Sequence, residues 1–290
     1  MLALALPPTA GAATARPVSE VVRIPLASGH ALGVDAGMIA GVFRPAGDGP
    51  FPVVVYSHGR SGAAERSATE VPEPWGFVRY WVRKGFAVVA PIRPGYGATG
   101  GEDREDSGVS YDVFGNCWGR PQFARAAAAA REAVGAAVAW ARAQPWAEAD
   151  RIVLMGTSMG GLASLAGGAV PHDGVVATIN FAGGTGGNGE ASPEHSCGAD
   201  AMEELMAAYG VRTRVPSLWL YARNDSFWGI ERPQAWFRAY ARGNRDSRLV
   251  LTDAVPGADG HQLLGRGSRL WIPPVDRFLA DHGWPSTARE

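Results

Sequence analysis

The fold of this chain is decided by one stretch, Arg151-Ile152-Val153-Leu154-Met155-Gly156-Thr157-Ser158-Met159-Gly160. Its first half is apolar and predicts a buried strand, and residues 159–165 predict a helix. Ser158 then stands on the turn between them. In so tight a turn the positions two before and two after the serine face each other, so a Cβ at either would clash, and both are glycine. The G-x-S-x-G pattern in this setting predicts a nucleophilic serine.

A serine hydroxyl is a weak nucleophile near neutral pH, so it needs a base, and a third group must orient that base. Where a serine stands on such a corner, its partners follow it in the chain, the acid first and the histidine last. Asp225 comes just after the apolar run 217–221, and His261 follows the last predicted strand. We therefore expect Ser158 as nucleophile, His261 as base and Asp225 as acid. Two other residues remain rivals for the acid, Asp253 and Asp259.

Acyl transfer also requires donors for the oxyanion of the tetrahedral intermediate. The residue after the nucleophile, Met159, would supply one backbone N–H at the start of a helix. The second is expected from the loop after the apolar run 51–56, with the backbone of Arg60 as the best candidate. His58, in the same loop, is interpreted as a structural support for it.

Strand and helix patterns alternate along the chain, which predicts an α/β fold with a mostly parallel central sheet and helices on both faces. We expect one domain over residues 17–290, with loop insertions at about 94–120 and 182–210. Apolar runs that predict strands occur at 18–27, 38–44, 51–56, 86–90, 151–155, 175–179, 216–221 and 248–252.

Four aromatic residues fall in or beside loops at the end of the sheet that carries the serine: Trp75, Trp118, Phe227 and Trp228. Two interpretations remain open for them. They either pack those loops against the body or form the wall of a substrate pocket for an acyl or aryl group.

Two cysteines, Cys117 and Cys197, both lie in glycine-rich stretches, and an even count favours a disulfide if the protein is exported. Residues 1–16 hold a short apolar segment followed by Ala13-Thr14-Ala15, which resembles a signal-peptide cleavage site without the usual basic leader. We therefore expect a secreted or periplasmic protein with its two cysteines bonded. A disordered tail on a cytoplasmic protein with two separate thiols is the alternative.

Charge, apolar runs and motif spacing indicate which kinds of partner and ligand this protein does not bind. The 290 residues carry a formal net charge of −1, which gives no general attraction to nucleic acid. No apolar run is long enough to span a membrane. The glycine-rich segment 183–189 lacks the Lys-Ser/Thr ending of a phosphate loop, and no histidine or cysteine spacing fits a metal. We expect a small-molecule substrate and no cofactor or metal, and the sequence leaves the oligomeric state open.

A set of short motifs, in order, resembles the α/β-hydrolases, and most closely their dienelactone-hydrolase-like and prolyl-oligopeptidase-like esterase branch. The resemblance spans about residues 20–283 and is carried by Val55-Tyr56-Ser57-His58-Gly59, Arg93-Pro94-Gly95-Tyr96-Gly97, Asp150-Arg151-Ile152, Gly156-Thr157-Ser158-Met159-Gly160-Gly161, Asn224-Asp225 and Asp259-Gly260-His261.

This resemblance implies a metal-independent serine hydrolase that works through an acyl-enzyme intermediate. Dienelactone hydrolases proper use a cysteine where this chain has Ser158, and the peptidases carry a propeller domain that this chain lacks. The expected activity is therefore hydrolysis of carboxylic esters. A peptidase or amidase with the same triad is the alternative, and an inactive hydrolase fold used as a binding module is a third.

Overall fold

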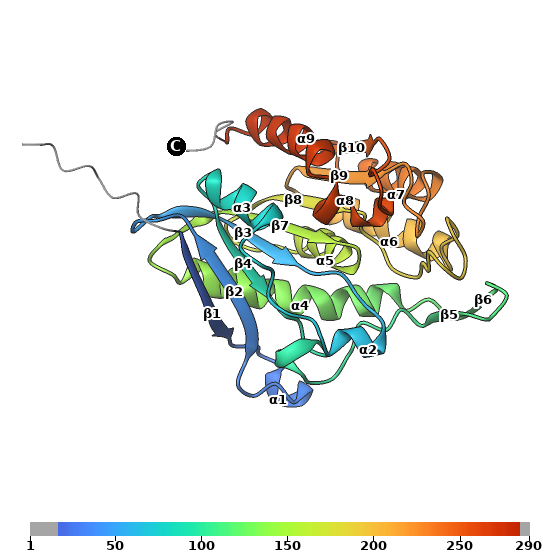
Figure 1. The fold of residues 1–290 in the computed structure, drawn as a ribbon, viewed down its shortest axis with the longest axis horizontal. Helices are drawn as coiled ribbons and strands as arrows, with labels where there is room; N and C mark the ends of the chain where they lie inside the picture. The colour runs from blue at the N-terminus through green and yellow to red at the C-terminus, as the bar shows by residue number, and fades with distance from the viewer. Residues whose placement is uncertain (1–16, 285–290) are drawn as a thin grey trace, which may run out of the picture.

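A computed structural model describes residues 17–284, and their centre is one sheet with the strand order β1-β2-β4-β3-β7-β8-β9-β10 (Figure 1). β1 pairs antiparallel with β2 and β2 antiparallel with β4, and the other neighbours pair in parallel. The prediction of a mostly parallel sheet is confirmed. The strands are β1 Val18–Ile24, β2 Met38–Arg44, β3 Phe51–Ser57, β4 Ala87–Pro91, β7 Ala147–Thr157, β8 Val175–Phe181, β9 Ser217–Ala222 and β10 Ser247–Thr252.

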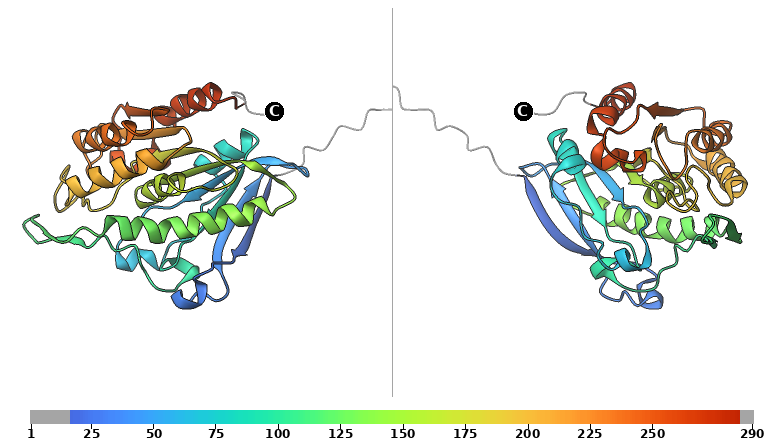
Figure 2. Two further views of the ribbon diagram at one scale, coloured as in Figure 1. Left: turned by 180° about the vertical axis from the view of Figure 1, so that it is seen from behind. Right: turned by 45° about the vertical axis from the view of Figure 1, so that its right-hand side comes forward.

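Helices cover both faces of this sheet (Figure 2). One face packs against α4 Phe123–Arg142, α5 Met159–Gly168, α6 Ala199–Arg212 and α7 Glu231–Ala241, and the other against α3 Gly76–Arg83, α8 Leu263–Arg266 and α9 Ser268–Asp281. Short turns of helix occur at α1 Gly29–Leu32, α2 Ala63–Arg66, η1 Gly97–Thr99 and η2 Gly260–Gln262.

The two cores follow from the alternation of side chains along each strand. In β3, Val53 and Val55 belong to the core beneath α4 and α5, whereas Val54 and Tyr56 belong to the core beneath α3 and α9. A strand apolar on both faces must be covered on both faces, which is why the uninterrupted apolar runs predicted the central strands.

The predicted loop at 94–120 holds structure that the sequence pattern missed. It contains η1 and a two-stranded hairpin, β5 Val109–Tyr111 and β6 Cys117–Gly119, which extends from the body in Figures 1 and 2. Its turn is closed by Gly115, whose φ of 79° suits glycine, and the carboxylate of Asp112 accepts the N–H of Asn116 at 2.9 Å. Strands of three residues are too short to show alternation.

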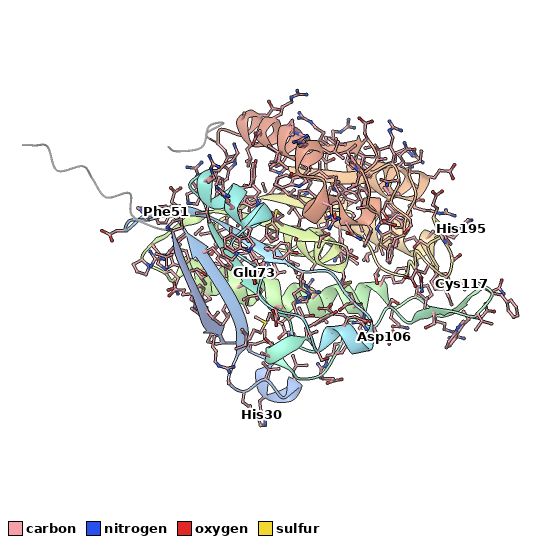
Figure 3. All side chains as sticks on the ribbon, viewed as in Figure 1. His30, Phe51, Glu73, Asp106, Cys117 and His195 are labelled. Atoms are coloured by element: carbon pink, nitrogen blue, oxygen red, sulfur yellow. A yellow bond between two sulfur atoms is a disulfide. The ribbon has the colours of Figure 1, made fainter. Side chains whose placement is uncertain are left out.

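A disulfide joins this hairpin to the segment 182–198, as expected. Cys117 on β6 is bonded to Cys197, with the two Cα atoms 5.6 Å apart, and Figure 3 labels Cys117 close to the loop that carries His195. The Tyr111 hydroxyl lies 2.7 Å from the carbonyl oxygen of Gly186 and accepts the N–H of Cys197 at 2.8 Å. Two distant segments of the chain are thus held side by side.

The expected signal-like segment, residues 1–16, lies outside the described residues. Within residues 17–284, no helix is both long enough and apolar enough to cross a membrane.

Candidate active site

Ser158 lies between β7 and α5 on a strained corner. Its φ is 54° and its ψ −125°, a combination that a non-glycine residue adopts only when its surroundings enforce it. A Cβ on Gly156 would collide with the carbonyl oxygen of Gly160, and one on Gly160 would collide with that of Ser57. The Ser158 N–H donates to the Phe181 carbonyl at 2.9 Å. The two glycines are therefore needed for the turn, as the sequence indicated.

The structure brings Ser158, His261 and Asp225 together. The Nε2 atom of His261 lies 3.0 Å from the Ser158 Oγ, and its Nδ1 lies 3.2 Å from each Asp225 carboxylate oxygen. Asp225 follows β9 and is completely buried. Its Oδ1 also accepts the backbone N–H groups of Phe227 at 2.9 Å and Trp228 at 3.3 Å. These two backbone hydrogen bonds hold the Asp225 carboxylate in place independently of its contact with the His261 ring.

The rival aspartates do not contact the His261 ring. Asp259 accepts the backbone N–H of His261 at 2.6 Å and so caps the short helix η2. Burial acts to raise the pKa of Asp259, but hydrogen bonds from Ser226 and from the His261 backbone hold it below its ordinary value. Asp253 is exposed. Of the three carboxylates, only Asp225 is placed to orient the base.

The loop after β3 is held by a neutral histidine. The Nε2 of His58 accepts the backbone N–H of Arg93 at 3.1 Å, and its Nδ1 lies 2.7 Å from the Gly59 carbonyl oxygen, which it can reach only as a donor. Burial, and then the charge of Arg93, hold the pKa of His58 well below its ordinary value. Both ring nitrogens of His58 are therefore engaged in hydrogen bonds to the backbone that hold this loop.

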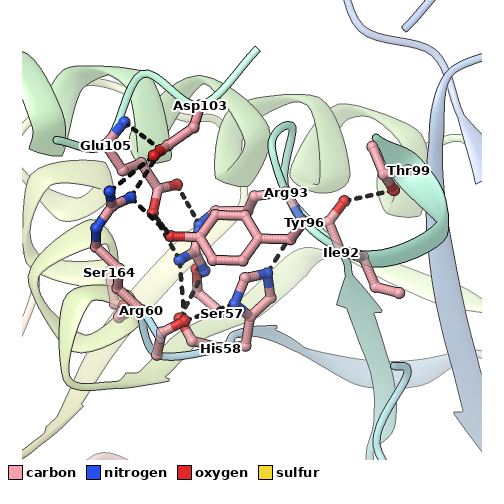
Figure 4. Close-up of polar contacts among 12 residues, drawn as sticks. Ser57, His58, Arg60, Ile92, Arg93, Tyr96, Thr99, Asp103, Glu105 and Ser164 are labelled. Atoms are coloured by element: carbon pink, nitrogen blue, oxygen red, sulfur yellow. Dashed lines mark hydrogen bonds and ion pairs between the residues drawn. The ribbon is translucent and has the colours of Figure 1, made fainter. Parts of the chain in front are cut away.

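Beneath this loop lies a buried ion pair whose role the sequence did not reveal (Figure 4). The Arg93 side chain is fully buried, and its Nε and Nη2 donate to the two oxygens of Glu105 at 2.5 and 2.9 Å. Its Nη1 donates to the Ser57 Oγ at 2.9 Å and to the His58 carbonyl at 2.6 Å. The pair thus anchors the backbone that leads to Arg60. An arginine just after a buried strand, followed by acidic residues, was the only signal in the sequence.

The Arg60 side chain points toward a second carboxylate, as Figure 4 shows. Its Nη1 and Nη2 donate to the two oxygens of Asp103 at 2.7 Å each, and its Nη1 also donates to the Tyr96 hydroxyl at 3.2 Å. Arg66 lies 3.3 Å from the same carboxylate. The bidentate pair fixes the position of Arg60 next to the serine.

The two expected oxyanion donors belong to segments that reach Ser158. Met159 is the first residue of α5, where backbone N–H groups have no partner within the helix. Gly59, the neighbour of Arg60, approaches so closely that a Cβ on it would lie 3.4 Å from the Ser158 Cβ. The donor roles of Met159 and Arg60 remain predictions.

Two cavities open on either side of Ser158. One, of about 440 Å³, is lined by Ser158, by His261 and by apolar side chains, among them Tyr56, Phe77 and Leu264. The other, of about 690 Å³, has more polar walls, which include Ser107, Ser110, Tyr111, Thr185, Asn188 and Glu190. Ser158, Arg60 and Phe227 line both.

Of the four aromatic candidates for a pocket, the structure brings two to the site. Phe227 stacks on the His261 ring at 4.0 Å between centroids and lines both cavities, and Trp228 lines the polar one. Trp75 and Trp118 line neither cavity and are 65% and 62% exposed, so the pocket interpretation, one of the two left open, is wrong for these two residues. Loop position alone did not show which way their rings would turn.

Comparison with known proteins gives matches in structure only. A scan against family models gives no match, and a search of curated proteins gives none either. An esterase of Pyrococcus furiosus matches with a TM-score of 0.59 and 14% identity, over 92% of this chain and 91% of that one. Esterase 2 of Thermogutta terrifontis, phosphonylated by sarin, matches with a TM-score of 0.57 and 18% identity, over 94% and 97%.

A dienelactone hydrolase-like promiscuous phosphotriesterase from metagenomic libraries matches with a TM-score of 0.55 and 17% identity, over 90% of this chain and 98% of that one. Larger peptidases also match, and this chain covers 40% and 35% of two of them. The chain therefore has the α/β-hydrolase fold, and the resemblance to dienelactone-hydrolase-like proteins and esterases seen in the sequence is confirmed at the level of structure.

Proposed function

We propose that this protein is a serine hydrolase that cleaves carboxylic esters through an acyl-enzyme intermediate. One observation carries the proposal: the Ser158 Oγ, on a strained corner, lies 3.0 Å from the His261 Nε2, and the same ring lies 3.2 Å from buried Asp225 on its other side. A nucleophile, a base and a group that orients the base are the three parts that covalent acyl transfer requires.

In acylation, the Ser158 Oγ attacks the ester carbonyl carbon while its proton passes to the His261 Nε2. Asp225 keeps the proton of the imidazole on Nδ1 and stabilises the imidazolium. The N–H groups of Met159 and Arg60 would receive the negative charge on the carbonyl oxygen. The imidazolium then protonates the alcohol oxygen as its bond to carbon breaks. Water repeats the sequence to release the acid.

A peptidase or amidase with the same triad is the second candidate. The esters are favoured because the fold matches esterases over almost their whole length and covers only the smaller part of the peptidases. The disulfide between Cys117 and Cys197 supports export, because such bonds persist in oxidising compartments. The Thermogutta terrifontis esterase is phosphonylated by sarin, and we expect organophosphonates to label Ser158 here.

The test is the pre-steady-state release of p-nitrophenol from p-nitrophenyl butyrate. We expect a burst of one p-nitrophenol per chain in the wild type. Ser158→Ala should abolish it and lower kcat by about 10⁴–10⁶-fold with an unchanged melting temperature. EDTA should leave the wild-type rate unaltered. Hydrolysis that persists in Ser158→Ala, or that EDTA removes and zinc restores, would contradict the proposal.

A further inference from the structure

The two cavities beside Ser158 differ in the part of the catalytic machinery that each contains. His261 lines the apolar cavity and is absent from the walls of the polar one. Met159, whose N–H is the proposed oxyanion donor, lines the polar cavity and is absent from the apolar one. Ser158 lies between them, so a substrate bound to its Oγ can extend into both.

The geometry of the tetrahedral intermediate assigns a substituent to each side. Besides Oγ, its carbon carries the oxyanion, the alcohol oxygen and the acyl chain. The oxyanion turns toward the N–H groups of Met159 and Arg60. The alcohol oxygen must lie within hydrogen-bond reach of the His261 Nε2, because that atom protonates it. The acyl chain takes the remaining direction, away from His261.

We propose, resting on the function proposed above, that the leaving alcohol occupies the apolar cavity and the acyl group occupies the polar cavity. The substrates are then esters of an apolar alcohol with an acid that carries hydrogen-bonding groups.

The walls of the alcohol cavity suit an aryl or branched alkyl group. The rings of Tyr56 and Phe77 pack with centroids 4.4 Å apart, and Leu264 is buried beside them. Burial, partly offset by the charge of Arg93, raises the pKa of Tyr56 to about 12, so its phenol stays neutral. Two polar residues of this wall, Gln262 and Arg266, are exposed and therefore belong to its mouth.

The walls of the acyl cavity offer groups that a polar acyl chain could bind. Thr185 lines this cavity and is only 7% exposed, and its hydroxyl has no hydrogen-bond partner within residues 17–284. A hydroxyl that makes no bond within the protein can both donate to and accept from a ligand that enters the cavity. Trp228 also lines this cavity and is fixed by its Nε1, which donates to the Ala182 carbonyl at 2.8 Å.

Because the reaction has two steps, the effects of the two cavities on its rate can be measured separately. The alcohol leaves during acylation, so the contacts between the alcohol and its cavity affect acylation alone. The acyl group stays bonded to Ser158 until water releases it, so the acyl cavity affects both steps. A variant in each cavity therefore has a distinct kinetic signature.

The experiment uses two matched pairs of esters. Benzyl and methyl esters of one acid test the alcohol cavity. The 4-carbamoylbutanoyl and 5-methylhexanoyl esters, which have the same shape, test the acyl cavity. We measure kcat/KM for each ester and the decay of the acyl-enzyme by intact mass. Val113→Ala is the control, because Val113 is 93% exposed at the hairpin tip and lines neither cavity.

We expect Phe77→Ala to lower the preference for the benzyl over the methyl ester about tenfold, because it removes most of one apolar wall. The rate of acyl-enzyme decay should match the wild type. Thr185→Val should lower the preference for the carbamoyl over the alkyl acid about 3- to 10-fold, in kcat/KM and in the decay of the acyl-enzyme alike. Melting temperatures check that both variants fold.

The opposite pattern would overturn the assignment: Phe77→Ala changes the acyl preference and the decay rate, and Thr185→Val changes the alcohol preference. A wild type that prefers the alkyl over the carbamoyl acid would overturn the substrate class. Failure of the proposed function looks different, because no acyl-enzyme then forms from any of the four esters.

Discussion

Two regions meet at Ser158, and they are built in different ways. The proposed triad comes from positions just beyond the carboxyl ends of β7, β9 and β10, at one edge of the sheet. The walls of the polar cavity come from segments outside the sheet, at 60–66, 107–111 and 184–190. The first region is positioned by the sheet itself. The second is positioned by a disulfide and by the ion pair of Arg60 with Asp103, which join segments far apart in the chain.

The residues proposed to carry out the reaction are therefore positioned differently from those proposed to select the substrate. Parallel strands have their carboxyl ends at the same edge of a sheet. Residues that follow those ends therefore lie close together even when the surrounding loops differ. The walls of the polar cavity instead depend on contacts such as Cys117–Cys197 and Arg60–Asp103, which lie outside the sheet. We therefore expect substitutions in the two regions to have separable effects on activity and on stability.

The largest effect is expected from Asp225→Asn, which keeps the side-chain shape and its contacts with the backbone of residues 227 and 228. It presents the wrong partner to the Nδ1 of His261, and kcat should fall about 10⁴-fold, as in other triads. The melting temperature should change little. Steady-state kinetics with p-nitrophenyl butyrate measure the loss. Asp253→Asn and Asp259→Asn are the matched controls, and a comparable loss in either one would reassign the acid.

The second effect concerns the region outside the sheet. The bond between Cys117 and Cys197 spans 80 residues. Replacing both cysteines with serine should lower the free energy of unfolding by about 4–5 kcal/mol in the chain-entropy account. Denaturant unfolding measures this change. Acylation of Ser158 should continue, because the triad does not depend on the hairpin. A loss of acylation as large as that of Asp225→Asn would remove the distinction between the two regions.

The third effect tests the buried pair that joins the regions. Glu105→Gln leaves the fully buried Arg93 charge without its counter-charge, and should destabilise the fold by about 3–5 kcal/mol. Replacing the pair by Arg93→Met with Glu105→Leu should restore much of that stability. Activity should stay low in this double variant, since Ser57 and the His58 carbonyl lose their donor. If activity returns together with stability, the pair has no positioning role for the loop.

The smallest effect is a pH dependence of stability that arises at His58. Its folded pKa is lowered by burial and by Arg93, so between that pKa and about 6.5 the unfolded chain binds a proton that the folded chain does not. The stability from neutral His58 is complete above about pH 6.5 and should fall by about 1.4 kcal/mol per pH unit below it. Unfolding of wild type and His58→Gln between pH 7.5 and 5 measures the difference in slope. Equal slopes would refute this account.

The sequence predicted the parts that depend on local pattern. Continuous apolar runs predicted the central strands because those strands are buried on both faces, and the glycines at 156 and 160 predicted the corner at Ser158. The hairpin β5–β6 was missed because three-residue strands show no alternation.

Apart from the disulfide and the proposed triad, contacts between separate segments of the chain left no pattern in the sequence. The Arg93–Glu105 pair is a single long-range contact, and the exposed positions of Trp75 and Trp118 depend on how their side chains turn. Sequence patterns therefore predicted the candidate catalytic residues and two aromatic residues of the cavity walls, Phe227 and Trp228, but not the rest of the walls.

The most direct test of the account is to find which atom becomes covalently modified. The protein is incubated with an alkyl fluorophosphonate, its intact mass is measured, and the labelled peptide is sequenced by mass spectrometry. We expect one adduct per chain, on Ser158, in step with the loss of esterase activity, and no adduct in Ser158→Ala. Continued hydrolysis without an adduct, or an adduct on another residue that follows the loss of activity, would contradict it.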